Sequence, residues 1–540
     1  MSLDQTPINQ LITDNIETWT STVKTKATTG RGSSKKLELY GVKKLRELIL
    51  ELAVRGKLVP QDPSDEPASV LLERIAEEKA QLVKDKKIKK PKKLPTLSQE
   101  ESESNLPTGW QWTHFINVLD FSGGGQPPKS FFSDEIKDGY VQLIQIRDLG
   151  PKPQPVYIPK EKASKFCTER DVMVGRYGAS VGKVFWGKNG AYNVALIKIH
   201  NDFDAYIPEF IYLLLRSPLG QSFFGGISRS AQDGFSKKDI EHKLVPCLSL
   251  NEQHRIVAKV DELMTLCDQL EQQTEASITA HQVLVTTLLD TLTNSANAEE
   301  LMQNWQMVAE HFDTLFTTEE SIDQLKQTIL QLAVMGKLVN IGEKKETLLK
   351  SVLTFGPRNG FSPKESSTET HLKVLKLGAT SYGVLDLKQS KFIDVDISDK
   401  PHLYLNRGDI LIQRGNSANF VGSNVLIQES YSDYIYPDLM MKLRVNNEVL
   451  PEYVSLLLSS KFSREHMWSQ MTGTSGTMPK ISKKVVEGVP IIFPVCLEVQ
   501  KIILEKYYEL IDVCELLMAG LNSLECTKVN LTDAIVEQAV

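Results

Sequence analysis

The sequence lacks the features that mark several large classes of protein. No stretch reaches the roughly 18 consecutive apolar residues of a membrane span, and the N-terminal segment shows no basic region followed by an apolar run. The six cysteines are widely spaced, form no C-x-x-C pair and have no clustered histidines beside them, which argues against a disulfide framework and a structural zinc site. We therefore expect a cytoplasmic protein that makes no membrane contact.

No single sign of charge dominates either. The 62 Lys and Arg residues and 68 Asp and Glu residues give a formal net charge of −6, so any surface that binds an acidic polymer must be local. Hydrophobic residues make up 41% of the chain, as in ordinary globular proteins. At about 150 residues per domain, 540 residues predict three to four folded units rather than one core.

The most informative feature present is an internal duplication. Residues 45–59 (LRELILELAVRGKLV) and 325–339 (LKQTILQLAVMGKLV) are identical at ten of fifteen positions. In both copies the apolar residues recur every three or four positions, which predicts an amphipathic helix. Gly56 and Gly336 stand where such a helix would end.

Two further repeats follow in each half of the chain. The Pro-Glu-aromatic segments at 208–210 and 451–453 each predict a short helix that begins at proline. Heptads of apolar residues then predict two coiled-coil helices, which would be either a rigid spacer or an ordinary helical hairpin. Their predicted buried positions are Ile256, Val260, Leu263, Cys267 and Leu270 in the first, and Ile503, Tyr507, Leu510, Cys514, Leu517, Leu521, Leu524 and Leu531 in the second.

Between the predicted helices lie two regions rich in glycine, aromatics and short apolar runs, which predict strands joined by turns. We read them as two α+β domains. The predicted boundaries are 1–104 for an N-terminal extension that ends in a Lys-rich linker, 105–250 for the first mixed domain, 251–350 for a central helical region, 351–497 for the second mixed domain and 498–540 for a C-terminal helix.

Motifs for chemistry are largely missing. The run Phe121–Gly125 superficially fits a methyltransferase loop, but no N-P-P-F or D-P-P-Y sequence follows. The run Gly178–Lys183 has the wrong spacing for a phosphate-binding loop. Asp438 followed by Lys442 is a low-information match to a nuclease site, and the histidines show no metal-binding spacing. An enzymatic function for the chain alone is therefore not supported.

The two mixed regions do share polar loops in register. Asp171–Ser180 is matched by Asp409–Ser417, and in each a predicted strand leads into Arg, Gly and small polar residues. A second pair, Ser228–Gly234 and Thr474–Lys480, precedes Ser-Lys-Lys sequences at 236 and 482. Such loops can be simple turns, but a guanidinium fork and backbone amides can also contact phosphates or base edges.

Taken together, these repeats and the Leu106–Trp110 segment make the chain resemble the DNA-specificity subunits of Type I restriction-modification systems. The resemblance implies two tandem α+β target recognition domains, separated by two long helices packed as an antiparallel coiled coil, in an internal pseudo-twofold repeat. Each domain would read one half of a bipartite, asymmetric site in double-stranded DNA, and the helices would set the spacer. The second half lacks an obvious Leu-Pro-x-Gly-Trp start.

The resemblance also implies partners. Two modification subunits would supply S-adenosylmethionine and adenine methylation, and restriction subunits would use ATP and Mg²⁺ for translocation and cleavage, so this chain would bind no cofactor or metal and perform no catalysis. We predict these DNA contacts, most of them in or beside the paired loops: Arg147, Arg176, Tyr177, Ser180, Lys183, Arg229 and Gln232 in the first half, and Arg414, Asn416, Ser417, Asn419, Thr474, Ser475 and Lys480 in the second.

Two other functions remain open from the sequence. The chain could be a methyltransferase or nuclease that acts alone, which S-adenosylmethionine binding or DNA cleavage by the purified chain would reveal. It could instead be a protein scaffold whose mixed domains read a ligand other than DNA. Salt-dependent, sequence-selective DNA binding would separate the DNA reader from the scaffold, because phosphate contacts weaken steeply with salt.

Overall fold

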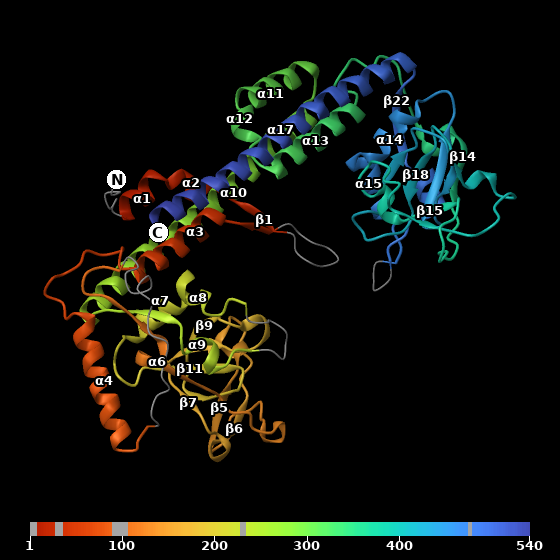
Figure 1. Cartoon of the computed structure of the whole chain (residues 1–540). Coiled ribbons are helices and arrows are strands. Elements are labelled where there is room, and N and C mark those ends of the chain that lie inside the picture. The colour runs from red at the N-terminus through yellow and green to blue at the C-terminus, as the bar shows by residue number, and fades with distance from the viewer. Residues whose placement is uncertain (1–7, 27–35, 89–105, 227–233, 474–477) are drawn as a thin grey trace. The chain divides into compact units, whose positions relative to one another are not determined.

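The structure is a computed structural model that describes residues 8–26, 36–88, 106–226, 234–473 and 478–540. It divides into two compact units (Figure 1). The first comprises residues 1–276 and 525–540, and the second comprises residues 277–524. Each unit combines one sheet-rich domain with helices that come from both halves of the chain. Among the helices of the described residues, none has the length and apolarity needed to cross a membrane.

The mixed domain of the first unit is built on two four-stranded sheets and one two-stranded sheet. One sheet is antiparallel throughout, whereas in the other β5 and β10 run parallel. The strand orders are β4 (Asp120–Gly123), β11 (Leu196–His200), β8 (Val172–Gly175), β9 (Val184–Trp186); then β6 (Tyr157–Pro159), β5 (Tyr140–Ile144), β10 (Gly190–Tyr192), β7 (Phe166–Cys167); and β12 (Leu244–Cys247) with β3 (Gln111–His114).

The mixed domain of the second unit repeats this topology strand for strand, including the parallel pair at the same place. The α+β class predicted for both regions is thus confirmed. The corresponding orders are β14 (Leu353–Asn359), β21 (Met440–Val445), β18 (Ile410–Gln413), β19 (Asn424–Leu426); then β16 (Ser390–Phe392), β15 (Lys373–Leu375), β20 (Tyr431–Ile435), β17 (Tyr404–Leu405); and β13 (Lys344–Leu348) with β22 (Pro490–Pro494).

Further helices complete the two units. The predicted helices that begin at proline are confirmed as α7 (Pro208–Arg216) and α14 (Pro451–Ser459). The others in the first unit are α1 (Ile8–Asp14), α2 (Ile16–Ser21), α4 (Ala68–Lys84), α6 (Phe115–Val118), α8 (Pro218–Ser222) and α9 (Lys237–Ile240), with the hairpin β1 (Lys24–Lys26) and β2 (Lys36–Glu38). Those in the second unit are α11 (Ala298–Glu310), α12 (Phe312–Leu315), α15 (Lys461–Ser469) and α16 (Lys483–Glu487).

The duplicated amphipathic segments form α3 (Tyr40–Val54) and α13 (Glu319–Val334). Both end as predicted at a glycine with left-handed backbone, Gly56 at φ +69° and Gly336 at φ +68°. The first glycine also permits a close approach, because a Cβ there would lie 2.3 Å from Pro107. Trp110 lies beside it and donates from Nε1 to Glu252 Oε2 at 2.8 Å, which fixes the start of the first mixed domain.

The second mixed domain starts differently. Strand β13, which pairs with β22, stands at residues 344–348, just before the boundary predicted at 351. No tryptophan occupies the place of Trp110 there, and Gly336 faces Ile341 instead. The predicted domain boundaries stay predictions, because the division into two units follows the helices as well as the sheets.

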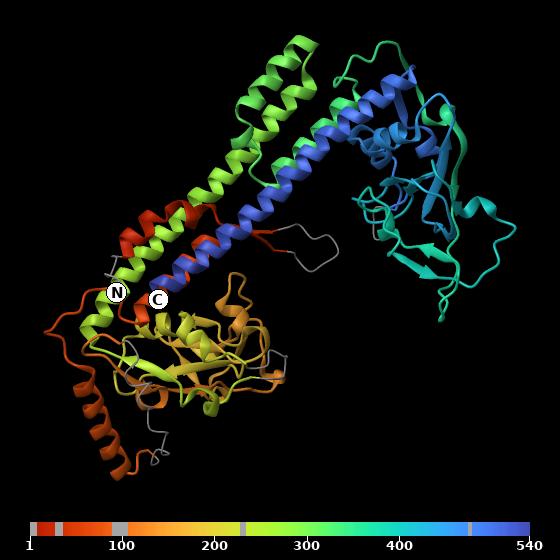
Figure 2. The same ribbon diagram turned by 45° about the horizontal axis from the view of Figure 1, so that its top comes forward.

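Two long helices, α10 (Leu250–Asn294) and α17 (Leu497–Ala539), run through both units. In the first unit, Ile256 and Val260 of α10 share a core with Ile535 of α17. In the second unit, Val285 of α10 shares a core with Cys514 of α17. Early residues of α10 thus contact late residues of α17, and late residues of α10 contact earlier residues of α17, so the two helices are antiparallel, as expected. Figure 2 shows the C-terminal end of α17 beside α3.

The predicted heptads fail at their last two positions. Leu524 and Leu531 are about half exposed, and Thr532 is buried in their place, with Oγ1 3.1 Å from Thr22 Oγ1. The cause is a phase shift, since the inward positions Leu517, Leu521 and 525 are separated by four residues twice in succession. The equivalent positions of α10 show the same step, at 270, 274 and 278.

A buried glutamine fastens each mixed domain to the long helix that follows it. Gln253 Nε2 donates to Ala205 O at 2.9 Å and Leu248 O at 3.3 Å, while its Oε1 accepts from Ile207 N at 2.8 Å. Gln500 repeats the arrangement, with bonds to Glu448 O, Pro494 O and Leu450 N. Both side chains are fully buried, so the amide is the partner of three backbone groups that water cannot reach.

We expect Gln253→Ala to lower the free energy of unfolding of the first unit by about 2–4 kcal/mol, because three buried backbone groups lose their partner. Hydrogen exchange of α7 and of the first turns of α10 measures the change locally. Gln272→Ala, at an exposed position of the same helix, is the control and should have little effect. Equal protection in the two variants would contradict this role of Gln253.

Candidate functional site

The paired loops of the two mixed domains occupy the same place in the fold. Each follows the central strand of the antiparallel sheet, β8 or β18, and turns back into β9 or β19. Arg176 N donates to Ala195 O at 2.9 Å, and Arg414 N donates to Leu439 O at 2.8 Å. Tyr177 forms a bridge with Gly234 in the first domain. A bridge between Gly415 and Lys480 has the same place in the second domain.

In the first domain, these contacts order the loop and leave cationic groups at its surface. Arg176 Nε donates to Phe235 O at 3.1 Å, and its guanidinium lies 5.1 Å from the centre of the Tyr177 ring. The Ser180 hydroxyl donates back to Tyr177 O at 2.5 Å. Lys183 is exposed, whereas Arg176, Tyr177 and Ser180 are partly buried. The loop therefore offers a guanidinium held by Phe235 O, an aromatic ring and an exposed ammonium.

In the second domain, several polar groups of the loop bond to one another. Asn416 Nδ2 donates to Gln413 Oε1 at 2.7 Å, and Asn416 Oδ1 accepts from Ser417 N at 2.7 Å. Asn416 is thus engaged in shaping the loop. Ser417 and Asn419 are exposed, and Arg414 is partly buried.

The remaining predicted contacts fall elsewhere. Arg147 is exposed in the short helix η2 (Ile146–Leu149), which follows β5 and so belongs to another loop; its Nη1 lies 3.4 Å from Gln154 Oε1. Lys480 is exposed and lies against the loop through its bridge with Gly415. Four predicted contacts lie outside the described residues: Arg229, Gln232, Thr474 and Ser475.

The sequence reasoning missed the side chains that support these loops. Gln221 Nε2 donates to Gly182 O at 2.9 Å. In the second domain, Arg464 donates to Ser423 Oγ at 2.8 Å and to Asn419 O at 2.7 Å, and burial lowers its pKa to about 10. Gln221 and Arg464 follow the paired prolines, 208 and 451, by the same thirteen residues. Extending that repeat along the chain would have identified both.

An ion pair lies at the opposite end of the central strand in each domain, partly buried in the first domain and fully buried in the second. Asp171 Oδ2 lies 2.9 Å from Lys198 Nζ and accepts from Thr168 N at 2.6 Å. Asp409 repeats both contacts, with Lys442 Nζ at 3.0 Å and Asn406 N at 2.9 Å. Each pair joins the start of the central strand to the neighbouring strand of the same sheet, β11 or β21. The lysine Nζ also donates to the second sheet, at Phe166 O (3.5 Å) in the first domain and at Tyr404 O (2.7 Å) in the second.

The second of these pairs is the more deeply buried and the more elaborate. Arg444 adds two hydrogen bonds to Asp409 Oδ1, at 2.8 and 2.6 Å. Burial lowers the pKa of Lys442, and the neighbouring carboxylate of Asp409 opposes that shift. Lys442 is 1% exposed and therefore has a structural role, which removes the basis of the weak nuclease match.

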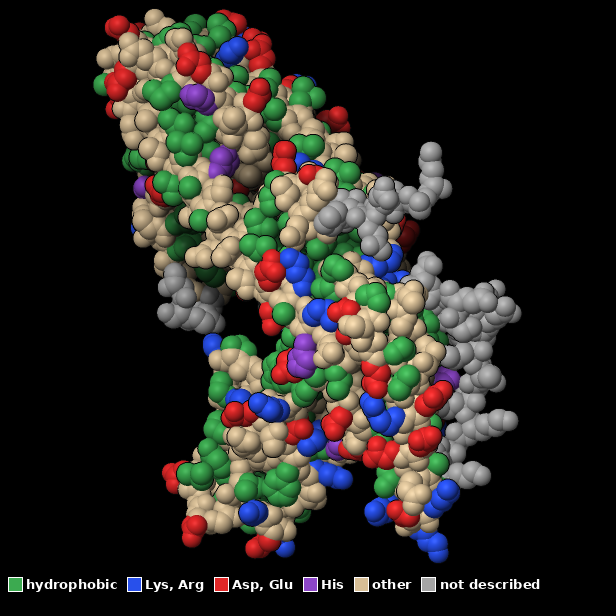
Figure 3. All heavy atoms as spheres, turned by 90° about the vertical axis from the view of Figure 1, so that its left-hand side faces the viewer, with side chains coloured by type: hydrophobic (Ala, Val, Ile, Leu, Met, Phe, Trp, Pro, Cys, Tyr) green, Lys and Arg blue, Asp and Glu red, His purple; other side chains and the backbone are tan. Residues whose placement is uncertain are grey.

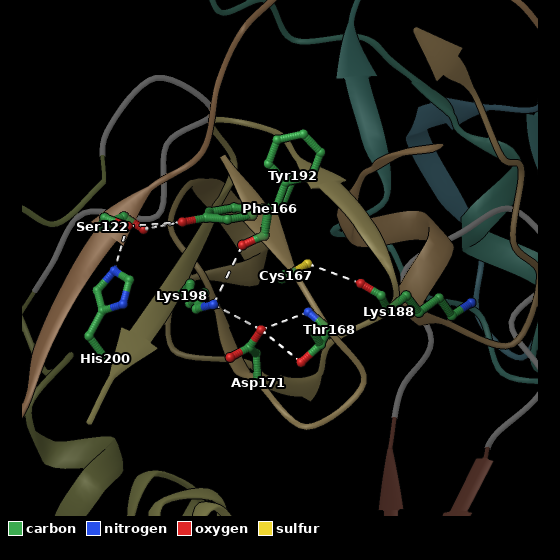
Figure 4. A network of polar contacts seen from close by, with 9 residues as sticks. All are labelled: Ser122, Phe166, Cys167, Thr168, Asp171, Lys188, Tyr192, Lys198 and His200. Carbon is green, nitrogen blue, oxygen red and sulfur yellow. Dashed lines mark hydrogen bonds and ion pairs between the residues drawn. The ribbon is translucent and has the colours of Figure 1, made fainter. Parts of the chain in front are cut away.

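Figure 4 shows the surroundings of the first pair. On the neighbouring strands, Ser122 Oγ lies 2.7 Å from His200 Nε2 and 2.9 Å from the Tyr192 hydroxyl. Burial lowers the pKa of His200 and raises that of Tyr192, so both rings favour their neutral forms. In the described residues no three His, Cys, Asp or Glu side chains gather in a way that would hold a metal ion.

Charge is mixed on the one face of the molecule that Figure 3 draws. On the face drawn in Figure 3, Lys and Arg side chains are interspersed with Asp and Glu rather than gathered into one basic field. This agrees with the net charge of −6. Any binding of an acidic polymer must therefore come from local groups such as the two loops.

Comparisons with known proteins identify the family. A sequence model of the Type I restriction modification DNA specificity domain matches residues 107–280. The chain is 36% identical to the Type I restriction enzyme EcoAI specificity subunit of Escherichia coli and 33% identical to the EcoEI specificity subunit of the same species, and both alignments cover 99% of this chain and 100% of the relative. The chain belongs to the Type I restriction enzyme specificity subunits.

A solved structure supports the fold of this specificity subunit. The similar chain comes from work on complex assembly and conformational transition of the type I R-M system, and it aligns with a TM-score of 0.50 at 17% sequence identity. The alignment covers 83% of this chain and 99% of that one. The resemblance drawn from the repeats is therefore confirmed, and the role of the family is DNA specificity.

We expect Asp409→Asn to destabilise the second mixed domain by about 3–5 kcal/mol, because it leaves the buried Lys442 ammonium without a counter-charge. Asp171→Asn should cost less in the first domain, since both partners there are 20% exposed and water can solvate the lysine. Hydrogen exchange of β18 and β8 in the two variants measures the difference. Equal losses would show that burial does not control the strength of these pairs.

Proposed function

We propose that this specificity subunit reads a bipartite, asymmetric site in double-stranded DNA, with each mixed domain reading one half. The observation that carries the proposal is the exact repetition of strand order together with non-identical loop residues. Because the same framework occurs in both mixed domains, it supports the same kind of binding in both. Different side chains at the loop, Tyr177 in one and Gly415 in the other, support different base sequences in the two halves.

The long helices are proposed to set the length of the unread spacer. An α-helix rises 1.5 Å per residue, so the 45 residues of α10 give a rod of about 68 Å. Because Gln253 and Gln500 fix each domain at the start of its helix, the number of helical residues determines where a reading loop can stand. In this proposal a fixed rod length selects one spacer length on the duplex.

Catalysis is proposed to belong to partner subunits. Two modification subunits would carry S-adenosylmethionine and methylate adenine, and restriction subunits would use ATP and Mg²⁺, so that this chain supplies only recognition. All six cysteines are free thiols, which suits a reducing cytoplasm.

One face of α17 in the second unit is proposed as a docking surface for a modification subunit. At 100° per residue, Ile502, Val513, Leu516 and Leu524 lie within one sector of the helix. Each is at least 49% exposed, and Leu516 is 74% exposed. Lys506 and Glu509 lie in the same sector between Ile502 and Val513, so the apolar part of this face extends from 513 to 524. Exposed apolar side chains that gather on one side of a surface helix mark a protein interaction site.

Replacing each loop arginine with alanine tests the assignment of one half-site to each mixed domain. The subunit is co-expressed with its modification subunits, and methylated adenines are mapped in host DNA. We expect Arg176→Ala to relax the motif at bases of one half-site and Arg414→Ala to relax it only in the other, each by roughly tenfold in selectivity, since a bidentate arginine contact contributes about 1–3 kcal/mol of discrimination.

Matched controls are Arg170→Ala and Arg407→Ala, because these exposed arginines stand at the opposite end of the same strands. Both controls should leave the motif unchanged. If either loop variant altered both halves together, or neither half, the assignment of one half-site to each domain would be wrong.

Leu516→Glu tests the docking surface. Placing a carboxylate in an apolar interface should reduce co-purification of modification subunits at least tenfold, because the charge must be desolvated on binding. Met302→Glu, a 68% exposed residue of α11, is the control and should leave the complex intact. A complex of normal stoichiometry with Leu516→Glu would place the docking surface elsewhere.

A further inference from the structure

A second loop of the second mixed domain stands beside the candidate site and carries an exposed aromatic residue. It joins β15 to β16 and begins with the short helix η6 (Leu377–Thr380). Hydrogen bonds close its base, from Lys376 N to Gln389 O at 2.7 Å and from Asp386 N to Ala379 O at 3.0 Å. At its tip, Tyr382 is 82% exposed and Val384 is 75% exposed.

The loop is fixed to the predicted reading loop by one buried side chain. Gln413 Nε2 lies 2.9 Å from Leu377 O, 3.0 Å from Thr380 Oγ1 and 3.1 Å from Ser381 Oγ. Its Oε1 accepts from Asn416 Nδ2, the bond that shapes the reading loop. A single fully buried amide therefore sets the positions of both loops.

The Tyr382 ring itself contacts the reading loop. It meets the ring of Phe420 edge to face, with centroids 5.6 Å apart. Phe420 follows Ser417 and Asn419, which are exposed. Tyr382 is thus oriented by a neighbour while most of its ring surface stays accessible, which is the arrangement of a preorganised contact residue.

We propose that Tyr382 is a specificity-determining residue of the second domain, whose ring packs against a base of the half-site read by the 414–419 loop. This inference rests on the function proposed above. In a duplex, an aromatic ring can make an apolar contact with a thymine methyl group at the edge of a base pair, and this contact does not need the hydroxyl group. Among the described residues, the Tyr382 ring makes its aromatic contact with the edge of Phe420, and Val384 near it at the loop tip is also largely exposed.

The first domain supports the placement. There η2 follows β5 just as η6 follows β15, and it presents the exposed Arg147. Each domain therefore has a second loop next to the parallel strand pair, with a guanidinium in one and an aromatic ring in the other. Two domains that read different bases are expected to differ at such positions.

The test uses the assembled complex with co-expressed modification subunits and the site found by methylation mapping with the unaltered chain. Affinity for that site is measured beside affinity for every single-base change in it. We expect Tyr382→Ala to lower affinity at least tenfold and to abolish discrimination at one or two adjacent bases within a single half-site. Tyr382→Phe should stay within about twofold, because the ring remains.

Phe462→Ala is the matched control. Phe462 is a 59% exposed aromatic residue of α15 in the same domain, and its position on the helix is 200° from that of Arg464. It should change neither affinity nor selectivity. Thermal unfolding of all variants should match the unaltered complex, since both rings are largely exposed.

The outcomes separate this inference from the proposed function. Sequence-selective binding by the unaltered complex with an unchanged profile for Tyr382→Ala would overturn the role of Tyr382 alone. An equal loss of affinity for every DNA, including unrelated sequences, would show a general contact and also overturn the specificity role. Absence of selective binding by the unaltered complex would overturn the proposed function together with this inference.

Discussion

A buried glutamine amide couples each mixed domain to the long helix that leaves it, and the rest of the architecture depends on that coupling. Gln253 and Gln500 each satisfy three backbone groups: the amide just before a proline-initiated helix, the carbonyl two residues before that amide, and a carbonyl just before the long helix. A domain fastened in this way cannot turn freely about its helix. The position of the proposed reading loop is therefore set by the helix, which the proposed measurement of DNA spacing requires.

The two domains separate framework from reading surface. The framework residues are the same in kind at both places, as the pairs Asp171–Lys198 and Asp409–Lys442 show. The loops at the other end of the central strand differ, and so do the side chains that hold them, Gln221 and Arg464. In the proposed function, the recognised sequence depends on the second group of residues, whereas the first group holds the fold.

Much of the fold could be predicted from the sequence, because the same residue patterns occur at equivalent positions in both halves of the chain. The strands at 172–175 and 410–413, the glycine ends of α3 and α13 and the antiparallel helices all follow from local pattern and repeat. The heptad prediction failed at Leu524 and Leu531, because a continuous helix changes the face it buries whenever two four-residue steps occur in succession.

The candidate site was less accessible to sequence reasoning. The Arg176 and Arg414 loops were found through their register, but Tyr382 was missed because its significance lies in exposure and in its contact with Phe420, which join residues far apart in the chain. Asn416 was predicted as a DNA contact, and the structure shows its amide engaged with Gln413. Tertiary contacts decide which polar groups already have hydrogen-bond partners, and the spacing of residues along the sequence does not reveal these contacts.

The central claim is that the two mixed domains are equivalent readers, each fastened to the start of one of two antiparallel helices. Replacing residues 344–494 with residues 111–247 tests it most directly, because the two segments begin and end on equivalent paired strands. Mapping of methylated adenines should then show a symmetric motif, with the first half-site and its inverted copy separated by a fixed spacer. A motif that kept its original second half, or that repeated the first half in the same direction, would contradict the account.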